Sequence, residues 1–196
     1  MFAGIIQAIG RIERVEALEA GVRLTIDSGS LGLGDAAIGD SIAVNGACLT
    51  ATSVSGRRFT ADVSRETLDC TSGLAAPGDV NLEKSLRLND KIGGHLVTGH
   101  VDGVGEVIAF DRAGESMRLV VHVPKELARY IARKGSVTID GVSLTVNRVD
   151  GAEFEVNLIP HTLEVTTLKR LSPGARVNIE VDLLARYMER LLNPGQ

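Results

Sequence analysis

Short segments in which apolar and polar residues alternate recur along the whole chain, and Gly, Asp and Asn residues separate them. This alternation is typical of antiparallel β-strands, because successive side chains of a strand point to opposite faces. It predicts strands over residues 23–27, 41–44, 59–63 and 80–83, and again over 118–123, 137–139, 154–158 and 177–181. About six strands in roughly 90 residues predict a small barrel, since closure leaves no exposed strand edge.

An internal repeat divides the chain. Displacing the sequence by 95 residues places Gly4 on Gly99 and aligns residues 41–51 with 136–146. After a slip of two residues, 80–83 aligns with 177–180. A repeat of this length indicates two copies of one domain, at 1–90 and 91–183, followed by an unrepeated segment, 184–196. We therefore predict a mainly β fold: two tandem homologous six-stranded antiparallel Greek-key β-barrels with short helices, plus a C-terminal helix.

Three segments have helical features. Residues 124–134 begin with Pro124 and precede Gly135, which are common residues at helix ends, so a helix is predicted there. The equivalent segment 30–38 contains glycines and predicts a weaker helix. A third helix is predicted over 182–193, with one apolar stripe and an end at Asn193, Pro194 and Gly195; the stripe consists of Leu183, Leu184, Tyr187, Met188, Leu191 and Leu192. Because the first repeat lacks this helix, we expect it to join subunits; packing on its own barrel is the alternative.

Two dipeptides, Asn45-Gly46 and Asp140-Gly141, lie between alternating runs and predict two-residue hairpin turns. The turns would set Ser41 opposite Thr50 and Ala43 opposite Cys48, which places these four side chains on one face. The other face would be apolar, with Ile42, Val44 and Leu49 in the core. The first face consists of small groups that suit a flat ligand, although a solvent-exposed polar face is the alternative. In the second repeat, Ser143 replaces the thiol of Cys48.

Composition narrows the class of protein. The net charge is only −4 over 196 residues, and Lys and Arg are dispersed, which argues against a nucleic-acid partner. The N-terminus lacks signal-peptide features, and no segment approaches the ~18 apolar residues of a membrane span, so a cytoplasmic protein is expected. Cys48, Cys70 and the histidines have no common zinc spacing, so no metal is expected. Each cysteine also suits the role of a small buried apolar side chain.

Several strings together carry a family resemblance: MFAGI, GDSIAVNGACLT, SRETLDCT, VNLEKSL, GGHLVTGHVDGVG, KGSVTIDGVSLTVN, IPHTLEVTTL and VNIEVD. In order and over essentially the whole chain, they resemble the riboflavin synthases. The resemblance implies a homotrimer of two-barrel subunits and no cofactor. It also implies conversion of two molecules of 6,7-dimethyl-8-ribityllumazine into riboflavin and 5-amino-6-ribitylaminouracil by transfer of a four-carbon unit. Lumazine synthase is the partner that this pathway suggests.

The resemblance also supplies candidate site residues, with facing barrels drawn from neighbouring subunits. It implies a first-repeat site formed by Gly4, Ile5, Ile6, Cys48, Leu49, Thr50, Asp62, Val63, Ser64, Arg65, Glu66 and Thr67. It implies a second-repeat site formed by Gly99, His100, Val101, Ser143, Leu144, Thr145, Asn157, Leu158, Ile159, Pro160, His161 and Thr162. Lys134 would reach a site from the neighbouring subunit. Phe2 would cover a bound ring or fill an apolar gap at the subunit contact.

The reaction requires a nucleophile at one lumazine and removal of a proton from a methyl group of the other. Ser41 and Cys48 are candidates for the nucleophile step, as attacking groups or as groups that position water. His100 is the candidate for proton handling, because an ordinary histidine titrates near neutral pH; a structural role in its glycine-rich segment is the alternative. For His95, in the same segment, a structural role is expected.

Two further candidates have simpler alternatives. Asp182 would hydrogen-bond a catalytic group or cap the helix that follows it. Lys134 ends a predicted helix, where the helix dipole alone favours a cation.

Two other functions fit parts of the pattern. Lumazine proteins share the two barrels and bind a lumazine or flavin without catalysis, but they would be expected to lose the polar residues of one barrel. A flavin-binding oxidoreductase barrel would require a dinucleotide-binding domain, for which 196 residues leave no room. The polar residues of both repeats therefore favour the enzyme.

Overall fold

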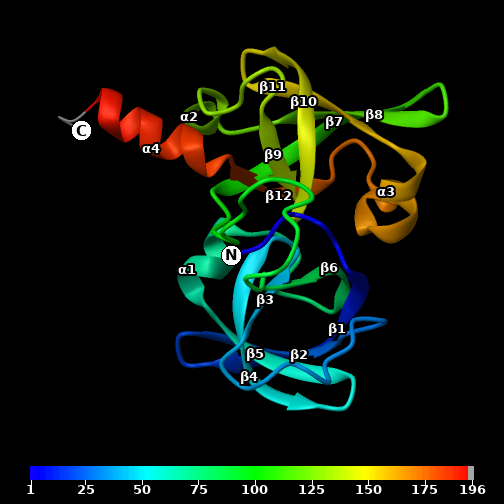
Figure 1. Ribbon diagram of the computed structural model, residues 1–196, viewed down its shortest axis with the longest axis vertical. Coiled ribbons are helices and arrows are strands. Elements are labelled where there is room, and N and C mark those ends of the chain that lie inside the picture. The colour runs from blue at the N-terminus through cyan, green and yellow to red at the C-terminus, as the bar shows by residue number, and fades with distance from the viewer. Residues whose placement is uncertain (194–196) are drawn as a thin grey trace.

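Two closed β-barrels stacked on one another make up the computed structural model, which describes residues 1–193 (Figure 1). The first barrel contains β1 (Ala8–Leu18), β2 (Gly21–Asp27), β3 (Ser41–Val44), β4 (Ala47–Ser55), β5 (Arg58–Ser64) and β6 (Gly78–Lys84). The second contains β7 (Gly103–Ala113), β8 (Ser116–His122), β9 (Ser136–Ile139), β10 (Val142–Asp150), β11 (Glu153–Leu158) and β12 (Arg176–Val181). Every predicted strand is present, and the predicted fold class is confirmed.

Both barrels have the same strand order. The first closes as β1-β2-β5-β4-β3-β6 and the second as β7-β8-β11-β10-β9-β12, with antiparallel pairs throughout. The register shifts at equivalent points, between Ala51 and Ser53 in β4 and between Val146 and Arg148 in β10. Such bulges increase the local bend and twist that a small barrel needs to close. The repeat in the sequence is therefore a repeat in the backbone.

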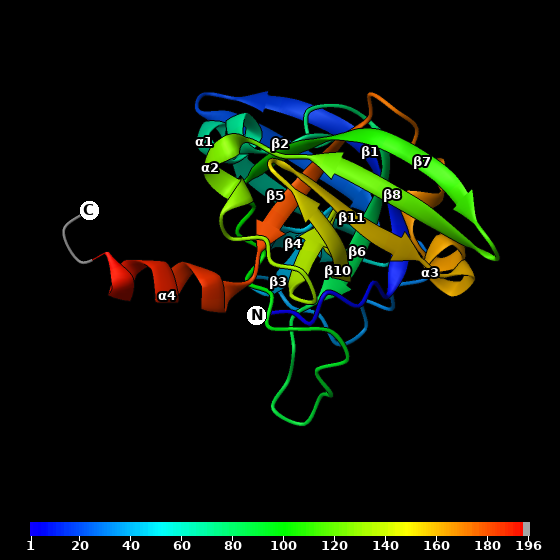
Figure 2. The ribbon, with the colours of Figure 1, turned by 90° about the horizontal axis from the view of Figure 1, so that it is seen from above.

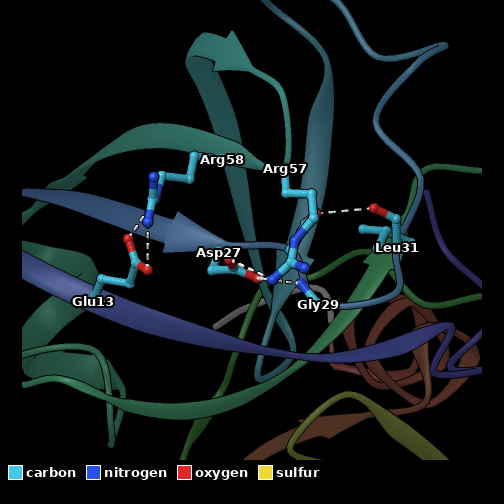
Figure 3. Close-up of polar contacts among 7 residues, drawn as sticks. Glu13, Asp27, Gly29, Leu31, Arg57 and Arg58 are labelled. Atoms are coloured by element: carbon cyan, nitrogen blue, oxygen red, sulfur yellow. Dashed lines mark hydrogen bonds and ion pairs between the residues drawn. The ribbon is translucent and has the colours of Figure 1, made fainter.

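Each barrel encloses its own apolar core, built around Phe59 in the first barrel and Phe154 in the second. On the surface of the first barrel, Arg57 and Arg58 form ion pairs with Asp27 and Glu13, respectively (Figure 3). The Gly29 backbone N–H and the Arg57 guanidinium both hold the pKa of Asp27 below its ordinary range. These contacts tie the β4–β5 turn to β1 and β2.

The helices are short. α1 (Arg65–Cys70) and α3 (Pro160–Val165) follow β5 and β11 at equivalent points, and a 3₁₀ turn, η1 (Thr167–Arg170), follows α3. α4 (Leu183–Leu192) confirms the predicted C-terminal helix and extends away from both barrels (Figures 1 and 2). Its predicted terminators Pro194 and Gly195 lie outside the described residues. None of the helices described in residues 1–193 is long and apolar enough to cross a membrane.

Two helix predictions were wrong. α2 covers only Lys125–Ala128 instead of 124–134, and residues 30–38 contain turns without a helix. Beyond α2 the chain leaves helical geometry to pair with the β10 bulge: Lys134 N–H donates to the Val146 carbonyl at 2.7 Å, and Val146 N–H donates to that of Gly135 at 3.0 Å. Gly39 and Asp40 make the equivalent contacts with Ala51 in the first barrel. Barrel closure thus overrides the local helical preference.

A polar network joins the barrels where the two hairpin turns meet. The side-chain amide of Asn178 donates to the Asn45 carbonyl at 2.9 Å, and that of Asn81 donates to the Asp140 carbonyl at 3.0 Å. Gly46 and Gly141 pack backbone to backbone, so closely that a Cβ on Gly46 would lie 2.8 Å from the Gly141 nitrogen. These contacts fix the relative orientation of the two hairpins.

Two extended segments also pass between the barrels. We call residues 2–6 the N-terminal arm and residues 97–101 the linker arm. They pair through Phe2 and Val97, whose backbone groups exchange hydrogen bonds of 2.7 and 3.0 Å. Phe2 is completely buried and packs with Val97, Ala43 and Cys48. In this subunit Phe2 therefore fills the apolar space between the barrels.

Candidate functional site

The two predicted hairpins are present with the predicted pairing. Ser41 lies opposite Thr50 and Ala43 opposite Cys48, and the turn residues Asn45 and Gly46 have φ of 45° and 84°. Ile42, Val44 and Leu49 are buried in the first core, as predicted. The opposite face of each hairpin is only partly exposed to solvent, because parts of the two arms cover it.

A hollow of ≈ 250 Å³ opens beside Cys48. The start of β4, α1 and the linker arm line it with Ala47, Cys48, Glu66, Thr67, Cys70, Thr71, Gly99, His100 and Val101. Ser64 caps α1 by accepting a 3.1 Å hydrogen bond from the Thr67 backbone N–H, which orients the lining residues of that helix. The hollow therefore combines a thiol, hydroxyl, carboxyl and imidazole groups with apolar walls.

Each arm contacts the site of the opposite barrel and not, as predicted, the site of its own repeat. The carbonyl of Gly99 accepts a 2.8 Å hydrogen bond from the Cys48 N–H, and that of Gly4 accepts one of 2.8 Å from the Ser143 N–H. Val101 packs on the first core and Ile6 on the second. The linker arm thus completes the Cys48 site, and the N-terminal arm completes the Ser143 site. Grouping each arm with its own repeat was wrong, because sequence alignment does not reveal which barrel an arm contacts.

The second barrel has a histidine at its Ser143 site. His95 Nδ1 lies 2.7 Å from Ser143 Oγ, and its buried Nε2 has no hydrogen-bond partner among residues 1–193. Burial lowers the pKa of His95 below its ordinary value of 6.5, against the opposing effect of the Asp182 carboxylate. Sequence reasoning gave His95 a structural role. Its position five residues before His100, in the GGHLVTGH run, was the available signal for a role at the site.

Comparisons with known proteins agree over the whole chain. The lumazine binding domain matches residues 3–85 and 98–182. Riboflavin synthase of Mycobacterium tuberculosis (strain ATCC 25618 / H37Rv) is 47% identical over 199 residues, covering 98% of each chain. Riboflavin synthase of Photobacterium phosphoreum is 45% identical over 198 residues, covering 98% of this chain and 89% of the relative. The chain belongs to the riboflavin synthase family.

Solved structures share the fold of this chain. The crystal structure of LumP complexed with riboflavin has a TM-score of 0.83 at 27% identity, covering 92% of this chain and 99% of LumP. LumP complexed with 6,7-dimethyl-8-(1'-D-ribityl) lumazine has a TM-score of 0.82 at 26% identity, with the same coverage. The predicted family is therefore confirmed by the sequence comparisons, and the solved structures share its two-barrel fold.

The structure separates Ser41 from Cys48. Ser41 lines a different hollow of ≈ 340 Å³, where Lys84 forms a 2.7 Å ion pair with Asp35. Thr50, opposite Ser41, is exposed. The two candidates for the nucleophile step therefore do not share a hollow within the described part of the subunit.

Other candidates from β4, β5, β10 and β11 differ in what they can offer a ligand. The side chains of Leu49, Val63 and Leu158 are buried in the barrel cores, so only their backbone groups face outward. Asp62 is held by Arg23 through two hydrogen bonds of 2.7 and 2.8 Å, which lower the pKa of its carboxyl. The remaining candidates in these strands and the two helices that follow lie on or near the surface: Arg65, Leu144, Thr145, Asn157, Ile159, Pro160, His161 and Thr162.

Asp182 and Lys134 have well-defined backbone roles. Asp182 is the N-cap of α4 and accepts a 3.0 Å hydrogen bond from the Leu184 N–H, which confirms the capping alternative. Lys134 is exposed and lies beyond α2 with a φ of 67°, where the first repeat has Gly39. It is therefore not at a helix end, and the helix dipole does not account for its position.

Proposed function

We propose that this chain is a riboflavin synthase that transfers a four-carbon unit between two molecules of 6,7-dimethyl-8-ribityllumazine, giving riboflavin and 5-amino-6-ribitylaminouracil. The observation that carries the proposal is 47% identity to a riboflavin synthase over 98% of both chains. The proposed reaction requires no added cofactor.

The two barrels supply two similar sites, which suits a reaction between two identical molecules. One site is the Cys48 hollow with His100, and the other is the surface around Ser143 and His95. Holding both reactants in a fixed relation replaces a bimolecular encounter with an effectively intramolecular one. In this proposal Cys48 acts at the nucleophile step, directly or through water, and His100 handles the proton.

The active assembly in this proposal is a homotrimer in which the first barrel of one subunit faces the second barrel of the next. The support is α4, whose apolar side chains Leu184, Tyr187, Met188 and Leu191 are all at least 60% exposed. Polar side chains of α4 contact its own subunit, where Glu189 pairs with Arg129 and Arg186 with Asp102. The apolar stripe is left exposed, and such a stripe suits contact with another subunit. Lys134 would then act in a neighbour's site. Association with lumazine synthase and a cytoplasmic location remain predictions.

A non-catalytic lumazine protein is the alternative function. The LumP structures support it through their bound lumazine and riboflavin, but they are only 26–27% identical to this chain. Here both barrels keep polar groups at the equivalent positions Cys48 and Ser143. The higher identity to riboflavin synthases therefore favours catalysis.

The purified chain incubated with 6,7-dimethyl-8-ribityllumazine alone tests the proposal. We expect riboflavin at half the molar amount of lumazine consumed, measured by absorbance. Cys48→Ala should slow the reaction, whereas Cys70→Ala, a matched change at the same hollow, should retain it, since the second repeat has Val165 there. Binding with altered fluorescence but no riboflavin would instead establish the lumazine-protein alternative.

A further inference from the structure

Two buried glutamates, one in the last strand of each barrel, hold the arms. Glu83 Oε1 accepts the Ala3 N–H at 2.7 Å, and its Oε2 accepts the Gly4 N–H at 3.1 Å. Glu180 Oε1 accepts both the N–H and the hydroxyl of Thr98, at 2.7 and 2.8 Å, and its Oε2 accepts the Gly99 N–H at 2.9 Å. The two clamps are equivalent, since the arms align at the 95-residue repeat.

Each clamped glycine, Gly4 or Gly99, accepts a hydrogen bond from a site residue of the barrel opposite to that of its glutamate. Glu83 belongs to the first barrel, but the carbonyl of Gly4 accepts the N–H of Ser143 in the second. Glu180 belongs to the second barrel, but the carbonyl of Gly99 accepts the N–H of Cys48 in the first. Each glutamate is therefore two hydrogen bonds away from a site residue of the opposite barrel.

The clamps need carboxylates in particular. Glu83 and Glu180 are only 2% and 3% exposed, and burying an ionisable group is unfavourable unless hydrogen bonds compensate. Burial raises the pKa of both carboxyls, and the backbone donors of the arms oppose this effect. Two carboxylate oxygens can accept two consecutive N–H groups, whereas an amide presents one oxygen and one NH₂ donor. Glutamine would therefore retain the shape but lose part of each clamp.

We propose that Glu83 is a positioning residue for the Ser143 site and Glu180 for the Cys48 site, each acting across the barrel interface through an arm. This inference rests on the proposed function for its catalytic consequence. It makes the two sites of one subunit structurally interdependent, because each site is completed by a segment fixed to the other barrel. Neither glutamate contacts its target side chain directly.

Thiol alkylation tests the crossed arrangement without substrate. In a Cys70→Ser background, Cys48 is the single thiol, and its reaction with iodoacetamide is followed by mass spectrometry. Glu180→Gln should accelerate this reaction by about fivefold, since it weakens a clamp over Cys48. Glu83→Gln, the matched change in Cys48's own barrel, should leave the rate within about twofold, since its clamp lies over the other site.

The reciprocal experiment uses Ser143→Cys with both natural cysteines replaced by serine. There Glu83→Gln should accelerate alkylation and Glu180→Gln should not. If Glu180→Gln fails to fold, Thr98→Ala serves in its place, because it removes one donor to Glu180 and gives the linker arm the alanine found at position 3. A glutamate change that acts on the thiol of its own barrel, on both thiols or on neither would overturn the proposal.

Riboflavin formation supplies the catalytic readout. Both Glu→Gln variants should lower kcat, since the proposed reaction needs two ordered sites. Crossed labelling with full activity in both variants would overturn the positioning role. If the variants show crossed labelling but the wild-type chain makes no riboflavin, the proposed function is overturned and the clamp arrangement stands. The two failures are therefore distinguishable.

Discussion

The backbone N–H of Cys48 donates a 2.8 Å hydrogen bond to the carbonyl of Gly99, although the two residues belong to different repeats. Gly99 has a φ of 79°, and a Cβ at this position would lie 2.6 Å from the Cys48 Cβ. Gly4 has the same relationship to Ser143, with a φ of 72° and a Cβ approach of 2.6 Å. Glycine is thus required at both positions by the backbone conformation and by the close approach of the arm.

Gly99→Ala should therefore displace the linker arm from Cys48. We expect riboflavin formation to fall by about 10²-fold, because small displacements of positioned groups cost catalysis heavily. Activity and thermal unfolding of the variant should be measured together. Gly151→Ala is the matched control, since Gly151 has a φ of 60° but no neighbour within 4 Å of its would-be Cβ. Equal loss of activity in both variants would show that backbone strain alone accounts for the effect.

Asp140 should make stability depend on pH. Asn45 in the first barrel accepts the Asn81 N–H at 2.8 Å, and Asp140 accepts the Asn178 N–H at the same distance. Burial raises the pKa of Asp140 from 3.8 to about 7, although the Asn178 N–H opposes this. The fold thus favours the protonated acid, and the free energy of unfolding should fall as pH rises from about 4 to above 7.

Asp140→Asn should remove this contribution, because Asn45 demonstrates that an amide fits the equivalent turn. At pH 8 the variant should be more stable than the wild type by up to about 4 kcal/mol, since a tenfold change in proton affinity corresponds to about 1.4 kcal/mol. Below pH 4 the gain should vanish. Urea unfolding of both proteins at several pH values measures the difference. A variant less stable than the wild type at pH 8 would contradict the prediction.

His95 should stay neutral to a lower pH than an ordinary histidine. Burial lowers its pKa below 6.5, so protonation should weaken the fold and the His95–Ser143 pair as pH falls below that value. NMR titration of labelled histidine, with His95→Gln for assignment, measures the midpoint. Asp182→Asn should lower it further, because it removes the opposing charge and keeps a residue suited to the α4 N-cap. A midpoint at or above 6.5 would refute the prediction.

The sequence was sufficient for what depends on local pattern and repetition. Alternation located the strands, and the Asn45-Gly46 dipeptide fixed the pairing of Cys48 with Ala43, because a two-residue turn leaves one register. The same local reasoning failed at residues 124–134, where Lys134 and Gly135 hydrogen-bond to Val146 instead of continuing α2. Helical signals at the ends of that segment could not reveal a partner in a bulged strand.

The residues that form the sites could be predicted better than the barrel that each arm contacts. Most of the residues that line the Cys48 hollow had been named, but Gly4 and Gly99 were assigned to the wrong barrels. Both assignments satisfy the sequence repeat equally well. The structure distinguishes them by the hydrogen bonds of Gly4 and Gly99 and by the packing of Ile6 and Val101 on opposite cores. His95 was given only a structural role, because its partner Ser143 lies 48 residues away along the chain.

The exposed stripe of α4 should control assembly. Leu184 and Leu191 are 65% and 79% exposed, and burying a leucine side chain stabilises an interface by about 1.5–3 kcal/mol. The double change Leu184→Ser and Leu191→Ser should convert trimers to monomers in analytical ultracentrifugation and lower riboflavin formation, because the proposed active sites lie between subunits. Arg190→Ser, an exposed change on the same helix, is the control and should leave assembly intact. A double variant that stays trimeric would assign assembly to the barrels, and a fully active monomer would place both reacting lumazines within one subunit.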